Sequence, residues 1–266
     1  MKLLICLIFT ITLTASLQAQ TPNETEVKQE LSEAASAYRK GNFTEAQAHA
    51  EKALTLDPEN KTALMYVARI IHAQYKPGDV TPENVAKARE AISAYQRILD
   101  RSLLDEESYK AVAYLLTAIK EEQLFREWVL QRASNVAIAN DKRAEAYVVL
   151  AANDWDCSFK LTELPDRKNT IVENGKARVT YKMPKAREEF ERAKECANRG
   201  LELANMAITL TPENEAAWSY KTNLILELAK LAEMAGEVQQ KSELYRQYEE
   251  ALNETTRLSN RSPSKP

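Results

Sequence analysis

The chain contains the same helix boundary twice. Residues 53–64 read ALTLDPENKTAL and residues 207–218 read AITLTPENEAAW, so seven of these twelve positions are identical. In both segments an aliphatic helix end is followed by Pro-Glu-Asn and then by a new helix start. Internal repetition of this kind predicts an array of helical pairs, in which each pair buries its apolar face against the next. Such arrays bind partners, but the repeat pattern does not identify the ligand.

The N-terminus has the features of a secretory signal peptide. It reads MKLLICLIFTITLTASLQAQ, and its lysine, apolar run and small-residue end predict removal of residues 1–19, with Ala19 the last residue removed. A membrane anchor is the alternative, but the run from Leu3 to Leu13 is short for spanning a bilayer. We therefore expect an exported protein, periplasmic or secreted, without stable membrane insertion after signal removal.

The composition indicates helix nearly throughout and argues against polyanionic partners. The chain has only five glycines and is rich in Ala, Leu, Glu, Lys and Gln. Its net charge of −3 becomes about −4 without Lys2, because 35 basic residues then stand against 39 acidic ones. With no basic surplus, we predict no nucleic-acid partner.

Two cysteines remain after signal removal, Cys157 and Cys196. An even number in an exported chain favours a disulfide, and closing a loop of about 40 residues stabilises a fold by roughly 3 to 4 kcal/mol. Two buried free thiols are the alternative. A metal site is not expected, because the only histidines, His49 and His72, are distant in sequence and zinc requires four ligands.

Residues 27–60 form the clearest helical pair. Small residues at Ala34, Ala46 and Ala53 allow two antiparallel helices to approach closely, and Pro58 ends the pair. This pattern resembles the tetratricopeptide repeat, whose 34-residue unit has three small residues and one proline at the corresponding places. The resemblance extends over residues 27–257. The chain is also similar to uncharacterised exported bacterial proteins with this repeat. It implies an all-α fold, a right-handed α-solenoid of helical pairs.

The repeats are interrupted by an insertion at 156–184. Residues 170–181 contain two short β-type runs around Asn174-Gly175, which predicts a small β-hairpin near 168–183, and Pro184 is expected to start a long helix. Residues 20–26 are assigned to a linker and residues 258–266 to a disordered tail. The predicted repeat units are about 27–60, 61–103, 104–140, 144–214 and 215–257.

The sequence contains no recognisable catalytic motif. It lacks a Gly-rich phosphate loop, a His-Glu-x-x-His motif and a G-x-S-x-G motif, so we predict a protein that is not an enzyme and has no cofactor. The five Asn-x-Ser/Thr sequons are treated as chance occurrences, because Asn and Thr are favoured in turns.

The tetratricopeptide resemblance also implies a binding groove, lined by the first helix of each pair. Aromatic, arginine and methionine side chains along such a groove suit a peptide or helix, although some groove positions pack against the next repeat instead. Leu31 and Ala35 stand where related repeats carry the lysine and asparagine that bind a C-terminal carboxylate, which argues against that ligand. The candidate groove residues are Tyr38, Arg39, Met65, Arg69, His72, Tyr114, Trp155 and Asn223, with Leu31 and Val148 at equivalent places.

Three functions remain open from the sequence. The favoured one is an exported, non-enzymatic scaffold that binds a protein or peptide in the cell envelope. The alternative is a module for a small ligand, saccharide or lipid, in which the insertion linked by Cys157 and Cys196 covers a pocket and Trp155 and Tyr181 stack on the ligand. The least favoured is an enzyme.

Overall fold

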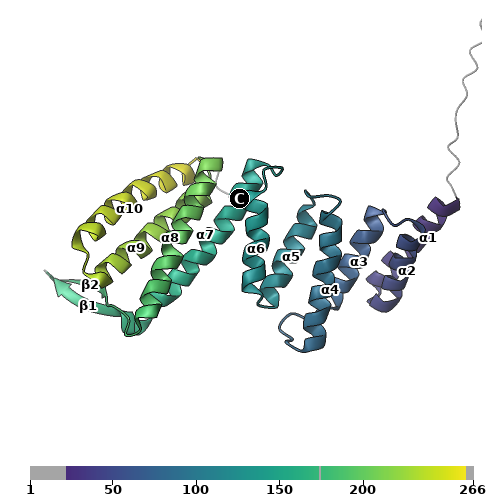
Figure 1. Cartoon of the computed structure of the whole chain (residues 1–266), viewed down its shortest axis with the longest axis horizontal. Coiled ribbons are helices and arrows are strands. Elements are labelled where there is room, and N and C mark those ends of the chain that lie inside the picture. The colour runs from purple at the N-terminus through teal and green to yellow at the C-terminus, as the bar shows by residue number, and fades with distance from the viewer. Residues whose placement is uncertain (1–21, 174, 262–266) are drawn as a thin grey trace, which may run out of the picture. The chain divides into compact units, whose positions relative to one another are not determined.

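The computed structural model describes residues 22–173 and 175–261. The expected signal peptide at 1–19 and Asn174 of the expected turn lie outside the described residues. The chain divides into two compact units, one ending at Ile119 and the other beginning at Lys120. This division falls inside the third predicted repeat, 104–140. Both units consist of antiparallel helices, and the second also contains a β-hairpin (Figure 1).

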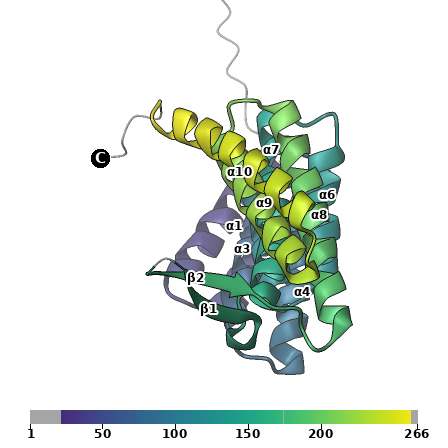
Figure 2. The same ribbon diagram turned by 90° about the vertical axis from the view of Figure 1, so that its left-hand side faces the viewer.

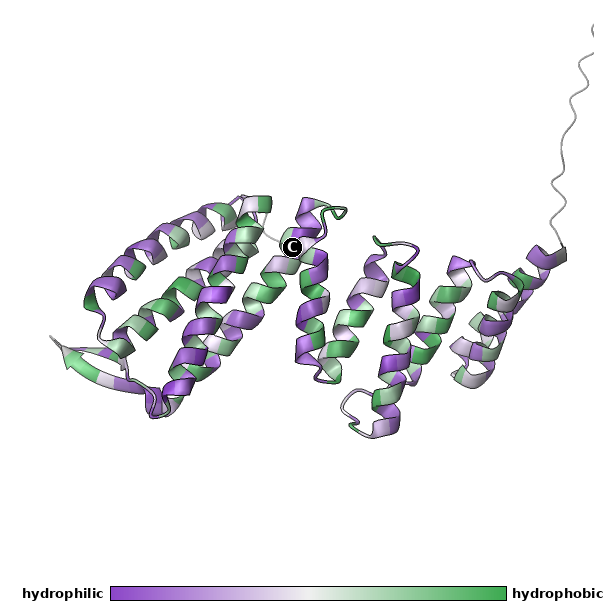
Figure 3. Cartoon of the chain, viewed as in Figure 1, coloured by the Kyte–Doolittle hydropathy of each residue, from purple (hydrophilic) through white to green (hydrophobic). Residues whose placement is uncertain are grey.

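Between residues 22 and 119, unit 1 contains five helices, each joined to the next by a short turn or loop. Ala34, Ala46 and Ala53 are fully buried between the first two helices, as the tetratricopeptide-like pattern requires. In Figure 3 the helices carry both hydrophobic and hydrophilic stretches, as helices with one buried and one exposed face do. The helices are α1 (Pro22–Arg39), α2 (Phe43–Leu56), α3 (Lys61–Gln74), α4 (Pro82–Leu99) and α5 (Glu106–Ala118).

The start of α1 differs from the sequence-based expectation. The segment 20–26 was assigned to a linker, but α1 begins at Pro22. Val27 is 4% exposed and packs with Ala53 and Ala63, and Asn23 Nδ2 donates to the carbonyl oxygen of Leu56 over 2.9 Å. These contacts with later helices make the first turn of α1 part of the fold.

Within its described residues unit 2 also contains five helices, and four of them, α7 to α10, are 21 to 24 residues long. The helices are α6 (Glu122–Ser134), α7 (Asn140–Thr162), α8 (Arg187–Leu210), α9 (Glu215–Ala235) and α10 (Val238–Ser259). Helix α10 and its buried Leu258 continue into the segment 258–266 that was predicted to be disordered. Residues 262–266 lie outside the described residues.

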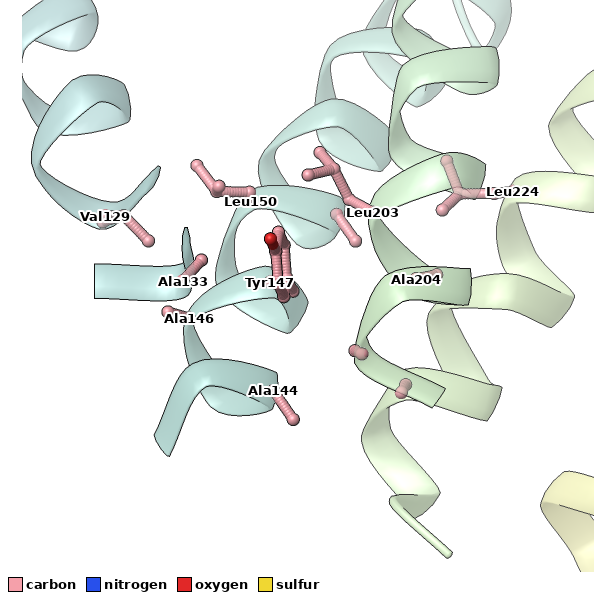
Figure 4. Packing of buried hydrophobic residues seen from close by; sticks show 12 residues of the cluster. Val129, Ala133, Ala144, Ala146, Tyr147, Leu150, Leu203, Ala204 and Leu224 are labelled. Carbon is pink, nitrogen blue, oxygen red and sulfur yellow. The ribbon is translucent and has the colours of Figure 1, made fainter. Parts of the chain in front are cut away.

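The main core of unit 2 lies between α6, α7, α8 and α9. Leu150 and Leu224 are fully buried there, and alanines such as Ala133 and Ala204 let the helices approach (Figure 4). Gly200 of α8 is the tightest point, because a Cβ atom there would lie 2.7 Å from Leu224 Cδ2 and 3.0 Å from Asp154 Cβ. The small residues therefore fix the spacing of these helices.

The insertion consists of extended helices and a β-hairpin. Helix α7 continues to Thr162, a 3₁₀ turn covers Pro165–Arg167, and β1 (Lys168–Glu173) pairs antiparallel with β2 (Lys176–Tyr181). The predicted hairpin is therefore present. Pro184 does not start the following helix, because α8 begins at Arg187 after a short extended segment. Cys157 and Cys196 form the predicted disulfide, which joins α7 to α8.

The duplicated segment has the same local structure in both copies. Asn60 caps α3 by accepting a hydrogen bond from Ala63 N, and Asn214 caps α9 by accepting one from Ala217 N, each over 3.0 Å. The preceding glutamates also form equivalent ion pairs, because Glu59 pairs with Arg101 and Glu213 pairs with Arg261. The repetition in the sequence thus encodes a helix start, as expected of an Asn N-cap.

Candidate functional site

Four of the predicted groove residues gather on α3 and α5, which are the first helices of two successive helical pairs. Met65, Arg69 and His72 lie three or four residues apart along α3, so their side chains leave one face of that helix. Tyr114 lies on α5 and is 49% exposed. We call these four residues the α3–α5 surface.

An ion pair joins α3 to α5 on the α3–α5 surface. The guanidinium of Arg69 donates from Nε to Glu107 Oε1 over 2.6 Å and from Nη2 to Glu107 Oε2 over 2.5 Å. These hydrogen bonds raise the pKa of Arg69, so its guanidinium remains charged. Both side chains are nearly half exposed, and pairs of this kind contribute about 1 kcal/mol or less to stability. Their larger effect is to hold a planar guanidinium at the surface.

An aromatic contact joins the same two helices. The rings of His72 and Tyr114 stack with centroids 5.7 Å apart, and Tyr95 of α4 meets the His72 ring edge-on at 5.8 Å. Burial lowers the pKa of His72, so its imidazole is neutral at physiological pH. Burial raises the pKa of Tyr95 to about 12. This end of the surface is consequently aromatic and uncharged near neutral pH.

A surface pocket of about 310 Å³ lies beside the other end of the α3–α5 surface. Its lining includes the side chains of Met65 and Arg69 together with Tyr66 and Ile98. Lys61, Arg101 and Asp105 add charged groups. The volume is near the lower end for ligand pockets, which suits one or two side chains of a peptide better than a large ligand.

The groove residues predicted on α1 differ in role from those of the α3–α5 surface. Tyr38 packs its ring on Phe43, with centroids 5.6 Å apart at the turn between α1 and α2. Leu31 packs partly buried on the cluster formed by Val27, Ala53 and Ala63. Arg39 is exposed at the end of α1. Tyr38 and Leu31 thus contribute to packing, the alternative role considered from the sequence.

The groove residues of unit 2 lie on α7 and α9. Trp155 contacts Phe159 at 5.0 Å and Tyr220 at 6.1 Å between ring centroids, and both Trp155 and Val148 pack on the core of the unit. Asn223 is half-buried on α9.

Tyr181, the second stacking residue of the small-ligand alternative, has its hydroxyl bonded to Glu163 Oε1 over 3.0 Å and its ring 5.3 Å from Lys230 Nζ. The rings required by that alternative are therefore already engaged within the protein.

A buried polar network in unit 2 was not foreseen from the sequence. Glu227 of α9 is 1% exposed, and it accepts hydrogen bonds from Lys230 Nζ and from Thr162 Oγ1 of α7, both over 2.6 Å. Lys230 also donates to Glu163 Oε1 over 2.7 Å, and Lys168 of β1 pairs with Glu163. In the sequence, this network was indicated by two charged residues, Glu227 and Lys230, within the apolar run of α9. The network attaches the hairpin to the helices.

A second unforeseen centre surrounds Asp154, which is 2% exposed on α7. Arg126 of α6 donates to both carboxylate oxygens over 3.0 and 3.1 Å, and Arg199 of α8 donates to Asp154 Oδ1 over 2.6 Å. The hydrogen bonds to Asp154 raise the pKa of Arg199. Because two guanidinium groups satisfy one carboxylate, this buried charge ties three helices together rather than offering a free acid or base.

The described residues contain no assembled metal site or membrane span. Within residues 22–173 and 175–261, no group of three or more His, Cys, Asp or Glu side chains is placed to hold a metal ion. Over the same part of the chain, no helix has the length and apolarity needed to cross a membrane.

Comparisons with known proteins found similarity in structure only. No family model and no curated protein matches the chain. The crystal structure of MamA protein is similar at 12% identity and a TM-score of 0.44, covering 91% of this chain and 98% of that one. A tetratricopeptide repeat protein from Parabacteroides merdae has 13% identity and a TM-score of 0.36, covering 91% and 95%. PilF of Pseudomonas aeruginosa has 11% identity and a TM-score of 0.34, covering 90% and 98%.

Proposed function

We propose that this chain is an exported, non-enzymatic scaffold that binds a protein or peptide partner on the α3–α5 surface. The observation that carries the proposal is the joining of two successive first helices by the Arg69–Glu107 pair and the His72–Tyr114 stack, beside a pocket lined by Met65. An exposed tyrosine, an arginine and a methionine are residue types enriched at protein interfaces. The pocket provides room for an anchoring side chain.

The exported location is part of the same proposal. It is supported by the signal-like sequence at residues 1–19 and by the Cys157–Cys196 pair, since structural disulfides persist mainly in oxidising compartments. Cell fractionation of the native host tests it, together with the N-terminal mass of the protein. Cleavage after Ala19 and recovery from the envelope or medium is expected. An intact N-terminus in the cytosolic fraction would contradict it.

Partner binding is tested by affinity capture with a purified, tagged protein. We expect a protein retained by the wild type to be lost when Met65→Ala and Tyr114→Ala are combined, because both truncations remove contact area without opening a core. Tyr245→Ala in α10 is the matched control, since Tyr245 is an exposed tyrosine of the other unit. If wild type and double variant retain the same proteins in the same amounts, the α3–α5 surface is not the binding site.

A further inference from the structure

In the hairpin of unit 2, the outer backbone edge of β1 is open. Lys182 N donates to the carbonyl oxygen of Arg167 over 2.8 Å, which makes this pair a hydrogen-bonded one. Hydrogen-bonded and non-hydrogen-bonded pairs alternate along an antiparallel ladder. Counted from this pair, the pairs Thr170–Val179 and Val172–Ala177 of the register are non-hydrogen-bonded ones. The N–H and C=O groups of Thr170 and Val172 therefore point away from β2. Within the described residues, no backbone hydrogen bond joins these two to another segment.

The open edge lacks the features that usually protect such strands. Proteins block exposed edges with proline, charged side chains or covering elements. From Asn169 to Val172 the strand reads Asn-Thr-Ile-Val, without charge or proline, and Val172 is 72% exposed. Both views of the ribbon show β2 on the side of α9 and α10 and β1 on the outer side (Figures 1 and 2).

The hairpin is fixed to the helices at its base. Glu163 at the end of α7 accepts from the Tyr181 hydroxyl over 3.0 Å and from Lys230 Nζ over 2.7 Å, and it pairs with Lys168. Each strand thus has one residue at a carboxylate held by a buried lysine. A strand that is already positioned has less conformational entropy to lose when it binds another chain.

The hairpin region is basic, although the whole chain is acidic. Residues 168–187 contain six basic residues and one acidic residue, Glu173, whereas the chain as a whole has a net charge of −3. Lys176, Lys182 and Lys185 are exposed. These charges lie on β2 and the segment after it, so they attract an acidic segment without blocking the edge of β1. They also disfavour pairing with a second copy, which would bring two basic hairpins together.

We propose that the edge of β1 is a second docking site, at which an extended acidic segment of a partner protein adds as a third strand. The main chain of the added segment would bond to Thr170 and Val172, the general mode of strand addition. On one face its side chains would meet the apolar side chain of Val172, which is 72% exposed. This site is on unit 2 and does not depend on the α3–α5 surface.

The test uses synthetic peptides of twelve residues in which Glu or Lys alternates with Val and Thr. We expect the acidic peptide to bind the wild-type protein and the basic one not to bind, by fluorescence anisotropy. Thr170→Pro removes the outward N–H without removing a ladder bond and should weaken binding at least about tenfold. Thr170→Val keeps that N–H and should bind like wild type.

Charge reversal tests whether the basic residues of the hairpin attract the acidic segment. Lys176→Glu combined with Lys182→Glu should weaken binding of the acidic peptide and reduce its dependence on salt. Lys40→Glu combined with Lys110→Glu makes the same change in net charge on unit 1 and should leave binding unaltered.

Amide hydrogen exchange on the wild type provides a readout that needs no variant. On addition of the acidic peptide, the amides of Thr170 and Val172 should become protected, whereas those of Asn169 and Ile171 are bonded to β2 beforehand. The proposal is overturned if the acidic peptide fails to bind, if Thr170→Pro binds it as tightly as wild type, or if exchange at Thr170 and Val172 does not change. Binding to phosphatidylglycerol vesicles in place of the peptide would also overturn it and assign the basic hairpin to a membrane surface.

Discussion

At the scale of single residues, Gly200 sets the closest approach between helices in unit 2. Gly200→Ala would gain about 1 kcal/mol in helix propensity, but its Cβ would lie 2.7 Å from Leu224 Cδ2 and 3.0 Å from Asp154 Cβ. Leu224 is fully buried and Asp154 is held by Arg126 and Arg199, and overpacking of a core costs about 1 to 3 kcal/mol. We therefore expect a net destabilisation, measured as a lower midpoint of urea unfolding.

A double-mutant cycle separates this clash from other causes. Leu224→Val shortens the side chain that Gly200→Ala would meet, so the double variant should lose less free energy of unfolding than the two single variants summed. Additive losses would mean that the contact with Leu224 is not the source of the destabilisation.

Lys120 occupies a backbone conformation that favours glycine. Its φ angle is 60°, close to the 77° of Gly41 and the 73° of Gly236, which occupy equivalent helix-ending turns. A left-handed residue other than glycine costs about 1 kcal/mol or more, so Lys120→Gly should raise the free energy of unfolding by about 0.5 to 1 kcal/mol. Thermal unfolding tests this, with Lys110→Gly on the exposed face of α5 as the control. That control should lower stability by about 1 kcal/mol, and a loss of stability in both variants would contradict the prediction.

At the scale of elements, local signals in the sequence predicted the helical pairs and the hairpin. Ala34, Ala46 and Ala53 predicted one close helix pair, and the β-type runs around 174–175 predicted a hairpin near 168–183, where the structure has strands at 168–173 and 176–181. The buried network was not predictable in the same way. Glu227 and Lys230 are visible as charges in an apolar run, but their partners Thr162 and Glu163 come from a helix more than 60 residues earlier. Only the packing of α7 on α9 brings them together.

The attachment of the hairpin should depend on pH through Glu163. Burial opposes its ionisation, but hydrogen bonds from Lys168 and Lys230 outweigh burial and lower the pKa of Glu163 from 4.5 to about 2. A carboxyl whose pKa is lowered in the folded state stabilises the fold above the unfolded pKa and loses this effect as the pH falls through the folded one. Protection of the hairpin amides should therefore be constant from pH 7 to about 5 and should decline between about 4.5 and 2.

Glu163→Gln is the matched variant for this pH dependence. It keeps the shape of the side chain but removes the charge that Lys168 and Lys230 contact, so the hairpin amides should exchange faster at neutral pH. The decline between about pH 4.5 and 2 should then be smaller. An unchanged pH profile in the variant would show that another carboxylate controls the attachment.

At the scale of the whole molecule, the sequence predicted an array of helical pairs, and the helices of the chain group into two compact units that meet at Ile119 and Lys120. Each unit has buried apolar clusters of its own. In unit 2 the Asp154 centre and the disulfide both join α7 to α8, and Arg199 Nη2 lies 3.8 Å from Cys196 Sγ. The repeat pattern could not reveal this division, because it describes neighbouring helices and not where a compact unit ends.

The compactness of unit 2 leads to a prediction for the isolated fragment 120–261. We expect it to fold by itself with the disulfide formed, because its core and both polar networks lie entirely within those residues. The disulfide spans a sequence separation of 39 residues. Closing a loop of that length restricts the unfolded chain, so replacing Cys157 and Cys196 by alanine should lower the free energy of unfolding by about 4 kcal/mol. Urea unfolding of the fragment and its double variant, followed by circular dichroism, measures the difference. A fragment that is unfolded with its disulfide intact would show that unit 2 requires the rest of the chain.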